Sequence, residues 1–272
     1  MNFKTLFKTQ KRPLWAFFCL ALPVCSLGAE ELTNSTCSTE ESGHTATVTK
    51  VIDGDTVIIG TGDHVRLIGI DTPEIDYKTG KAEAGAIAAR DALQAMIARQ
   101  QQALLIFDQQ RVDQYGRTLA HLFLADGTNV QASLLAQGLA VPFPYPPDLK
   151  FVDCYHEAST TAMQAKRGLW QSPDYQPVWL DKTPTLNPGY HTVIAKVLSI
   201  RKSKQTLTLV VRPDFSLKIQ KEDWKYFDNM DINGLVSTLI QVQGELYARG
   251  KEVLMRVRHP SAITLLPPEH EH

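Results

Sequence analysis

The stretch from residue 46 to residue 70 constrains the fold most, because its short apolar runs are separated by glycine and aspartate. The first two runs flank Asp53-Gly54, and residues 60–63 (Gly-Thr-Gly-Asp) precede a third run at 65–70. Apolar runs of this length, separated by turns of this composition, are typical of β-hairpins. The pattern therefore predicts that the first folded part of the chain begins as a β-sheet.

The next hundred residues alternate between the helical and the strand pattern. Alanine-rich sequence predicts a first helix, and Gly138 stands where a glycine commonly ends a helix. The expected order is a helix at 82–102, strands at about 103–108 and 117–125, and helices at about 128–137 and 150–166.

Residues 172–189 predict a linker, because Pro173, Pro177, Pro184 and Pro188 interrupt them. A second β-rich unit is expected at 190–266, with a short helical piece near 222–230. Five apolar runs in this unit fit a second small barrel, which is OB-like in one interpretation and an unrelated β domain in the other. Its aromatic residues stack bases in the first interpretation and fill a core or surface in the second; they are Trp224, Tyr226, Phe227 and Tyr247.

Charge is unevenly distributed along the 272 residues. The composition, 43% hydrophobic and 21% charged, excludes a disordered or collagen-like chain, and the net charge of −1 argues against a nucleic-acid binder. However, residues 30–184 carry 12 basic and 20 acidic residues, whereas residues 185–272 carry 12 basic and 9 acidic residues. The basic character therefore belongs to the second unit.

Residues 1–29 predict a signal peptide that is cleaved after Ala29. They hold four basic and no acidic residues, followed by an apolar run and small residues. An uncleaved N-terminal anchor is the alternative. A flexible lead at 30–45 follows, and the mature protein is expected to be periplasmic or secreted, with no stable membrane anchor. Only Cys37 and Cys154 remain after cleavage, so an oxidising compartment predicts that they form a disulfide, against the alternative of two free thiols.

Three motifs contain the residues that could take part in catalysis or ligand binding. Asp53-Gly54-Asp55-Thr56 is, taken alone, a hairpin turn. The run Val-Arg-Leu-Ile-Gly-Ile-Asp-Thr-Pro-Glu at 65–74 places Arg66 in an apolar strand, where an unpaired charge is costly. The run Asp-Gln-Tyr-Gly-Arg-Thr-Leu-Ala at 113–120 puts Arg117 directly after a glycine turn.

Together these motifs supply the groups that phosphodiester hydrolysis requires. Asp55 and Asp71 offer hard oxygen ligands for Ca²⁺. Two guanidinium groups, Arg66 and Arg117, suit a bidentate grip on a phosphate, and Glu74 suits activation of a water. A metal, a base and cationic donors in one set indicate a nuclease.

At these motifs the sequence resembles the staphylococcal nuclease (thermonuclease-like) family. The resemblance extends from about residue 47 to residue 170 and includes Ala-Gln-Gly-Leu-Ala at 136–140 and Ala-Lys-Arg-Gly-Leu-Trp at 165–170. It implies a nuclease domain at 46–171 that folds as a five-stranded OB-type barrel with packed helices. The expected fold class is mainly β with α, followed by the second β-rich domain.

The resemblance also implies a role for each matching residue. Ca²⁺ would be bound by Asp55, Asp71 and the carbonyl of Thr72, with Glu74 as general base and Arg66 and Arg117 on the scissile phosphate. The substrate would be DNA and/or RNA, cleaved with little sequence preference to leave 3′-phosphate ends. Residues expected near the substrate are Tyr115, Tyr145 and Lys78, the last with a solvated loop lysine as its alternative.

Two other functions stay open at this point. A non-catalytic nucleic-acid-binding OB-fold protein of the cell envelope would keep the barrel without the chemistry. A structural envelope protein would fit the export signal but would leave the carboxylates and arginines without a role. The sequence implies no protein partner.

Overall fold

The computed structural model describes residues 37–267. The predicted signal peptide, residues 1–29, and the first part of the predicted lead lie outside this range. Within it, no helix is both long and apolar enough to cross a membrane.

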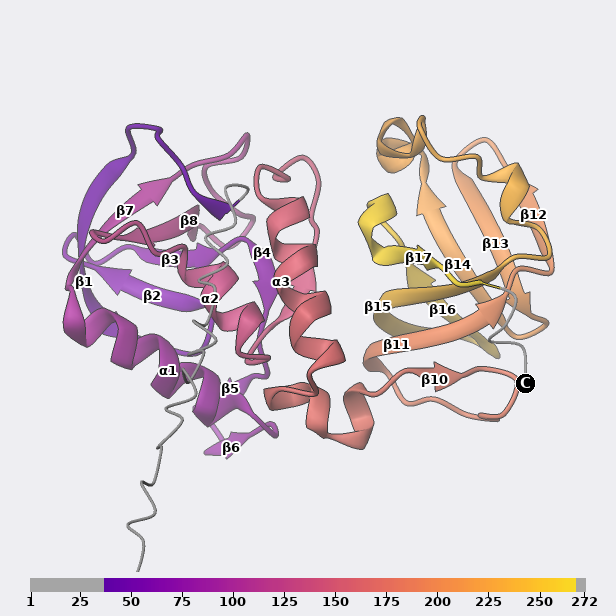
Figure 1. Cartoon of the computed structure of the whole chain (residues 1–272), viewed down its shortest axis with the longest axis horizontal. Helices are drawn as coiled ribbons and strands as arrows, with labels where there is room; N and C mark the ends of the chain where they lie inside the picture. Colours follow the sequence, from indigo (N-terminus) through magenta and orange to yellow (C-terminus); the bar gives the residue numbers. More distant parts are fainter. Residues whose placement is uncertain (1–36, 268–272) are drawn as a thin grey trace, which may run out of the picture. The chain divides into compact units, whose positions relative to one another are not determined.

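A closed five-stranded barrel forms the first part of the structure (Figure 1). Its strands pair in the order β1-β2-β3-β8-β7, and β3 runs parallel to β8 while the other pairs are antiparallel. Their bounds are β1 His44–Val51, β2 Thr56–Ile59, β3 His64–Leu67, β7 Gln102–Ile106 and β8 Thr118–Leu124. The predicted hairpins are confirmed, and with them the barrel that the resemblance implied.

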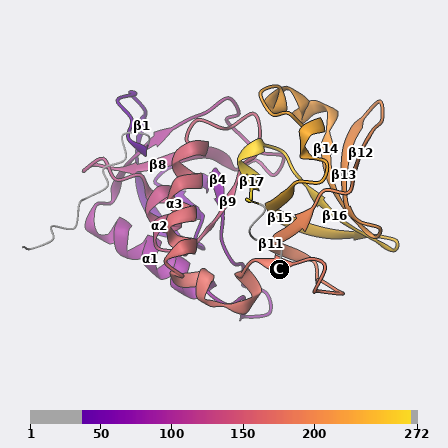
Figure 2. The same cartoon turned by 45° about the vertical axis from the view of Figure 1, so that its right-hand side comes forward.

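Three helices pack on the barrel, and α2 and α3 contact each other (Figure 2). They are α1 Ala86–Arg99, α2 Val130–Ala136 and α3 Val152–Gln164. The first helix is shorter than the predicted 82–102. It begins only after Gly85, which adopts a left-handed conformation with φ +94°, and it ends at Arg99. The end of α2 follows the prediction, since Gly138 has φ +69° and its N–H donates to Leu135 O.

Two short strand pairs extend from the barrel. They are β4 Gly69–Asp71 with β9 Val141–Phe143, and β5 Ile75–Asp76 with β6 Lys81–Ala82. Gly69 has φ +86°, and a Cβ there would lie 2.6 Å from the Tyr155 ring. The glycine therefore allows the chain to turn from β3 into β4 directly against α3.

A disulfide joins Cys37 to Cys154 on α3, as the cysteine count predicted. The two Cα atoms are 5.2 Å apart, and 117 residues separate the cysteines in sequence. Cys154 is buried within the main core, which consists of the inward faces of the barrel strands and the helices that cover them. The disulfide therefore ties the start of the described chain to the helix that closes this core.

The second part is a mixed sheet, drawn from orange to yellow in Figure 1. Its strands follow the order β10-β11-β15-β16-β14-β13-β12, with β17 paired to β15. Their bounds are β10 Val178–Trp179, β11 Gly189–Lys196, β12 Ser199–Lys202, β13 Thr206–Arg212, β14 Phe215–Gln220, β15 Leu239–Arg249, β16 Glu252–Arg256 and β17 Ile263–Leu265. The prediction of a second β-rich region is confirmed, and its described pairings form an open path rather than a closed barrel.

Alternation of side chains divides this sheet into an apolar and a polar face. In β14, Phe215, Leu217 and Ile219 are buried in a separate core, whereas the intervening residues are partly exposed. Two of the five apolar runs do not form single strands, and the run at 193–200 is divided between β11 and β12. The run at 235–242 begins as a 3₁₀ helix, and its strand starts only at Leu239.

Short 3₁₀ helices connect several of these elements. The predicted helical piece near 222–230 is one of them, and the predicted linker contains another together with β10. Their bounds are Gly168–Gln171, Pro173–Tyr175, Lys221–Phe227, Asn233–Leu235 and Pro260–Ala262.

Candidate active site

Arg66 joins two of the predicted carboxylates. One terminal nitrogen of its guanidinium lies 2.6 Å from Asp55 Oδ2, and the other lies 2.8 Å from Asp71 Oδ1. The same side chain donates to Leu67 O at 3.2 Å. The charge of Arg66, which lies in an apolar strand, is therefore paired with two carboxylates. These contacts bring the first two motifs together in one cluster.

Asp55 is the buried member of this cluster, with 3% of its surface exposed. The backbone N–H and the hydroxyl of Thr72 donate to Asp55 Oδ2 at 3.2 and 3.1 Å, and the hydroxyl of Thr56 donates to Oδ1 at 3.0 Å. Burial raises the pKa of Asp55 to about 7, with Arg66 opposing this and Asp53 and Asp71 adding to it. One guanidinium does not compensate the carboxylates gathered here.

Asp71 lies at the open side of the cluster, where 40% of its side chain is exposed. Burial raises its pKa to about 6, Arg66 lowers it, and Glu74 and Glu245 raise it. Glu245 belongs to β15, so the second sheet contributes a negative charge that reaches this carboxylate.

Glu74 is exposed, and its backbone N–H donates to Glu83 Oε2 at 2.9 Å. Atoms around its carboxyl still remove part of the surrounding water, which raises its pKa, and the charge of Asp53 raises it further. Arg66 and Arg117 both lower the pKa of Glu74, so the charges of these three residues are close enough to interact. Asp53 and Glu83 were not predicted as members of this region.

Arg117 is held by Asp113, a residue that the sequence analysis placed in the motif without a role. Arg117 Nε donates to Asp113 Oδ2 at 2.7 Å, and its backbone N–H donates to Oδ1 at 2.9 Å. The same Oδ1 accepts from the N–H of Tyr115 at 2.9 Å, and Gly116 has φ +82°. A carboxylate four residues before an arginine across a glycine turn was the signal available in the sequence.

A cavity of about 570 Å³ brings both arginines and both predicted tyrosines together. Arg66, Arg117, Tyr115 and Tyr145 line it, together with Phe143, which stacks on Tyr145 with ring centroids 6.1 Å apart. Tyr115 is 75% exposed and Tyr145 46% exposed, so both rings are available to a bound molecule. The cavity combines cationic walls with aromatic faces.

Lys78 does not line this cavity. It is exposed in the turn between β5 and β6, where its backbone N–H donates to Asp76 Oδ1 at 2.8 Å. The structure therefore separates Lys78 from the other predicted substrate-binding residues.

Among residues 37–267, no group of three or more His, Cys, Asp or Glu side chains has the geometry of a metal site. The donor chemistry nevertheless fits a hard cation, because carboxylate oxygens of Asp55 and Asp71 both contact the guanidinium of Arg66 and therefore lie on either side of one cationic group. Burial is the main cause of the raised pKa of both groups and neighbouring carboxylates add to it; a bound cation would favour their charged forms.

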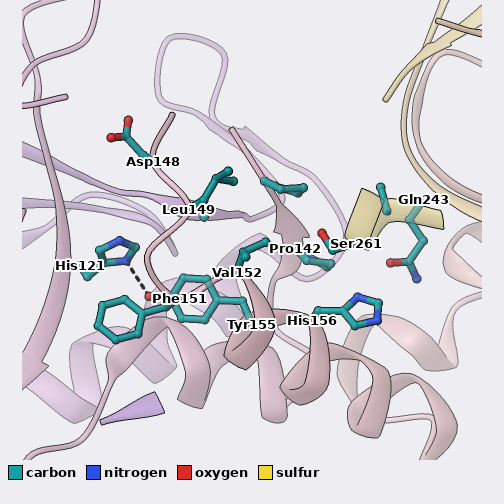
Figure 3. Close-up of a pocket in the computed structure, with 13 residues that line it drawn as sticks. His121, Pro142, Asp148, Leu149, Phe151, Val152, Tyr155, His156, Gln243 and Ser261 are labelled. Carbon is teal, nitrogen blue, oxygen red and sulfur yellow. Dashed lines mark hydrogen bonds between the residues drawn. The ribbon is translucent and has the colours of Figure 1, made fainter. Parts of the chain in front are cut away.

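A second cavity lies behind the site, beside a buried histidine (Figure 3). His121 and Tyr155 line one side of it, and Gln243 and Ser261 line the other. His121 Nδ1 is 2.8 Å from the Tyr155 hydroxyl oxygen, which the dashed line in Figure 3 marks. The volume is about 20 Å³, which holds about one water and excludes a substrate.

Comparisons with known proteins match the first part of the structure. The family described as Staphylococcal nuclease homologue matches residues 64–172. The chain is 34% identical over 137 residues to a thermonuclease of Staphylococcus intermedius, covering 49% of this chain and 80% of that protein. A thermonuclease of Staphylococcus hyicus is 32% identical over 46% of this chain and 75% of its own length. Endonuclease YncB of Bacillus subtilis is 31% identical over 47% of this chain and 63% of its own length. With the barrel and the Arg66 cluster in place, these similarities establish that the chain belongs to the staphylococcal nuclease family.

Proposed function

We propose that this protein is an exported, Ca²⁺-dependent nuclease that hydrolyses phosphodiester bonds of DNA and/or RNA with little sequence preference, leaving 3′-phosphate ends. The observation that carries the proposal is the convergence of Asp55 and Asp71 on Arg66, at the edge of a cavity that Arg117 also lines. The relatives named as thermonucleases and as an endonuclease support the same reaction class.

Glu74 would act as the general base. Its exposed carboxyl can reach a water molecule, and its raised pKa gives it more affinity for a proton than an ordinary glutamate has. The proton removed from the attacking water would rest on this carboxyl while the new bond to phosphorus forms.

Arg66 and Arg117 would bind the scissile phosphate. Each guanidinium keeps N–H groups beyond those that its carboxylate partner accepts, and a planar donor pair matches two phosphoryl oxygens. Their positive charge would oppose the negative charge that develops on those oxygens as the bond to the leaving oxygen lengthens.

Asp55, Asp71 and the carbonyl of Thr72 would hold Ca²⁺. When bound, the ion supplies positive charge next to the phosphate. The chain's own part is to hold the two carboxylates in place: Arg66 contacts both, and the two donors of Thr72 bind Asp55 in the described structure.

Export is proposed from two independent features. The disulfide between Cys37 and Cys154 is typical of a protein that folds in an oxidising compartment, and residues 1–29 have the composition of a signal peptide. The domain plan that we propose consists of the nuclease domain at 46–171 and an accessory β-rich domain at 190–266.

The proposal is tested by incubating the mature protein with single- and double-stranded DNA and RNA, with Ca²⁺ or with a chelator. Cleavage that stops on chelation, with 3′-phosphate ends on the products, is the expected result. Binding without cleavage would instead identify a non-catalytic nucleic-acid-binding protein. Neither binding nor cleavage would leave a structural role in the envelope.

A further inference from the structure

An arginine of the second sheet reaches the rim of the candidate active site. Arg258 follows β16, and the central carbon of its guanidinium lies 3.6 Å from the centroid of the Tyr145 ring. Tyr145 lines the cavity that also contains Arg66 and Arg117. Residues 173–267 lie outside the family match, so Arg258 is a feature of this chain's added region.

The hydrogen-bonding capacity of Arg258 is largely unused within residues 37–267. Only 14% of its side chain is exposed, and its buried Nε has no partner among the described residues. Its nearest carboxylate oxygen, Asp223 Oδ1, is 3.7 Å away. Arg256 binds the same aspartate at 3.0 Å, so the stronger ion pair belongs to Arg256. A largely buried guanidinium with an unpartnered N–H group is stabilised by an anion that accepts from it.

We propose that Arg258 binds a phosphate of the substrate strand next to the scissile one, with the face of Tyr145 holding its guanidinium plane in position. This inference rests on the proposed nuclease function. A cation stacked on an aromatic face is oriented by that contact but keeps its edge free for hydrogen bonds. Arg66 and Arg117 are assigned to the scissile phosphate, and Arg258 contacts Tyr145, which lines the same cavity.

The charge distribution gives this contact a physical purpose. Residues 30–184 carry eight more acidic than basic residues, and such a surface repels a polyanion. Residues 185–272 carry three more basic than acidic residues. Arg258, placed against Tyr145 by the second sheet, would add to the attraction that Arg66 and Arg117 supply, and would give the added region a part in substrate binding.

The test compares Arg258→Met and Arg258→Lys with Arg201→Met in the full chain. Arg201 is exposed on β12, an edge strand three places from β16 in the sheet, so its replacement removes the same charge away from the cavity. Asp223 keeps its contact with Arg256 in the Arg258 variants, which protects the fold. Affinity for a labelled single-stranded oligonucleotide is measured in a Glu74→Gln background, and KM and kcat are measured in the otherwise unchanged protein.

We expect Arg258→Met to weaken oligonucleotide binding and raise KM by about tenfold, with kcat unchanged. The slope of log affinity against log salt should fall by about 0.7, the value for one phosphate contact on a single strand. Arg258→Lys should keep most of the slope but recover only part of the affinity, and Arg201→Met should resemble the parent. Cleavage of a dinucleotide, which is too short to supply the neighbouring phosphate, should be unaffected by Arg258→Met.

Two results would overturn the inference while the nuclease function stands. One is an Arg258→Met protein that cleaves and binds the oligonucleotide like the parent. The other is an equal loss of kcat on the dinucleotide and the oligonucleotide, which would indicate a structural effect. An unmodified protein that does not cleave nucleic acid would reject the proposed function itself, and this inference with it.

Discussion

Arg117 Nε donates a hydrogen bond to Asp113 Oδ2 at 2.7 Å, which fixes the arginine at the wall of the candidate active site. The charge of Arg117 also lowers the pKa of Asp113, as expected for a tight ion pair. We predict that Asp113→Asn lowers kcat/KM about tenfold by loosening Arg117, because a charge-assisted hydrogen bond becomes a neutral one. Steady-state kinetics check this, and Asp113→Asn added to Arg117→Gly should cause little further loss. Full additivity of the two changes would contradict a positioning role.

Replacement of the three predicted catalytic residues should abolish most of the activity. Glu74→Gln, Arg66→Gly and Arg117→Gly are each expected to lower turnover by orders of magnitude, since each removes a group that acts in the transition state. Circular dichroism establishes that each variant is folded. Lys78→Gln is the matched control, because Lys78 is exposed outside the cavity. Near-parental cleavage by all three variants would reject the site assignment.

Arg66 and Asp55 should be strongly coupled in stability. Asp55 is 3% exposed and lies 2.6 Å from Arg66, so Arg66→Met leaves a buried carboxylate without its cation. The expected loss is about 3 kcal/mol of unfolding free energy, and Asp55→Asn in the same chain should restore part of it. Urea denaturation of the single and double variants measures the coupling. If the double variant loses as much unfolding free energy as the two single variants together, the two residues are not coupled.

The disulfide should contribute a large share of the stability. It closes a loop between residues 117 positions apart, and in the chain-entropy account a loop of this length corresponds to about 5 kcal/mol. Cys37→Ser with Cys154→Ser should therefore lower the denaturation midpoint substantially without changing the barrel. Alkylation of the native parent should find no reactive thiol at either cysteine, and two alkylated thiols would contradict the bridge.

His121 should contribute a loss of stability as the pH drops below about 6.5, opposed by Asp55 and Asp71, whose raised pKa values favour the folded state at lower pH. His121 is 1% exposed, and burial lowers its pKa while Asp108 opposes the shift. The unfolded chain, with a histidine pKa of about 6.5, then takes up a proton that the folded state does not, so lower pH favours unfolding. His121→Gln should remove this contribution below about pH 6.5, measured by urea denaturation across pH. His156 and His259, whose pKa values burial also lowers, remain in both proteins. Exposed His64→Gln should leave the slope unchanged, and the same slope in His121→Gln would be evidence against the role of His121.

Much of the fold could be predicted because the determining signals are local. The turns at Asp53-Gly54 and Gly138 depend on residues that are neighbours in sequence, and the structure confirms both. Element boundaries were harder to predict. The first helix begins after Gly85 rather than at residue 82, because a left-handed glycine conformation overrides the helical propensity of the residues around it.

The candidate site divides in the same way. The motifs were enough to predict five site residues, because their types and order are typical of phosphodiester hydrolysis: Asp55, Arg66, Asp71, Glu74 and Arg117. Asp113 belongs to a motif, but the sequence did not indicate its role. Its carboxylate accepts from Arg117 because of the geometry of the turn between them. The role of Lys78 stays a prediction: Lys78 does not line the cavity, and neither does its neighbour in sequence Glu74.

The sequence by itself determined the nuclease-like motifs, the order of strands and helices and the pairing of Cys37 with Cys154. Two contacts came only from the packing of the elements: Arg66 pairs with two carboxylates, and Arg258 from the second sheet lies against Tyr145. The physical reason is that local patterns report on backbone preference and burial, whereas a contact between residues 113 positions apart depends on how the elements pack. Charge follows the same logic, since the net −1 of the whole chain hides an acidic catalytic region and a basic addition that meet at that contact.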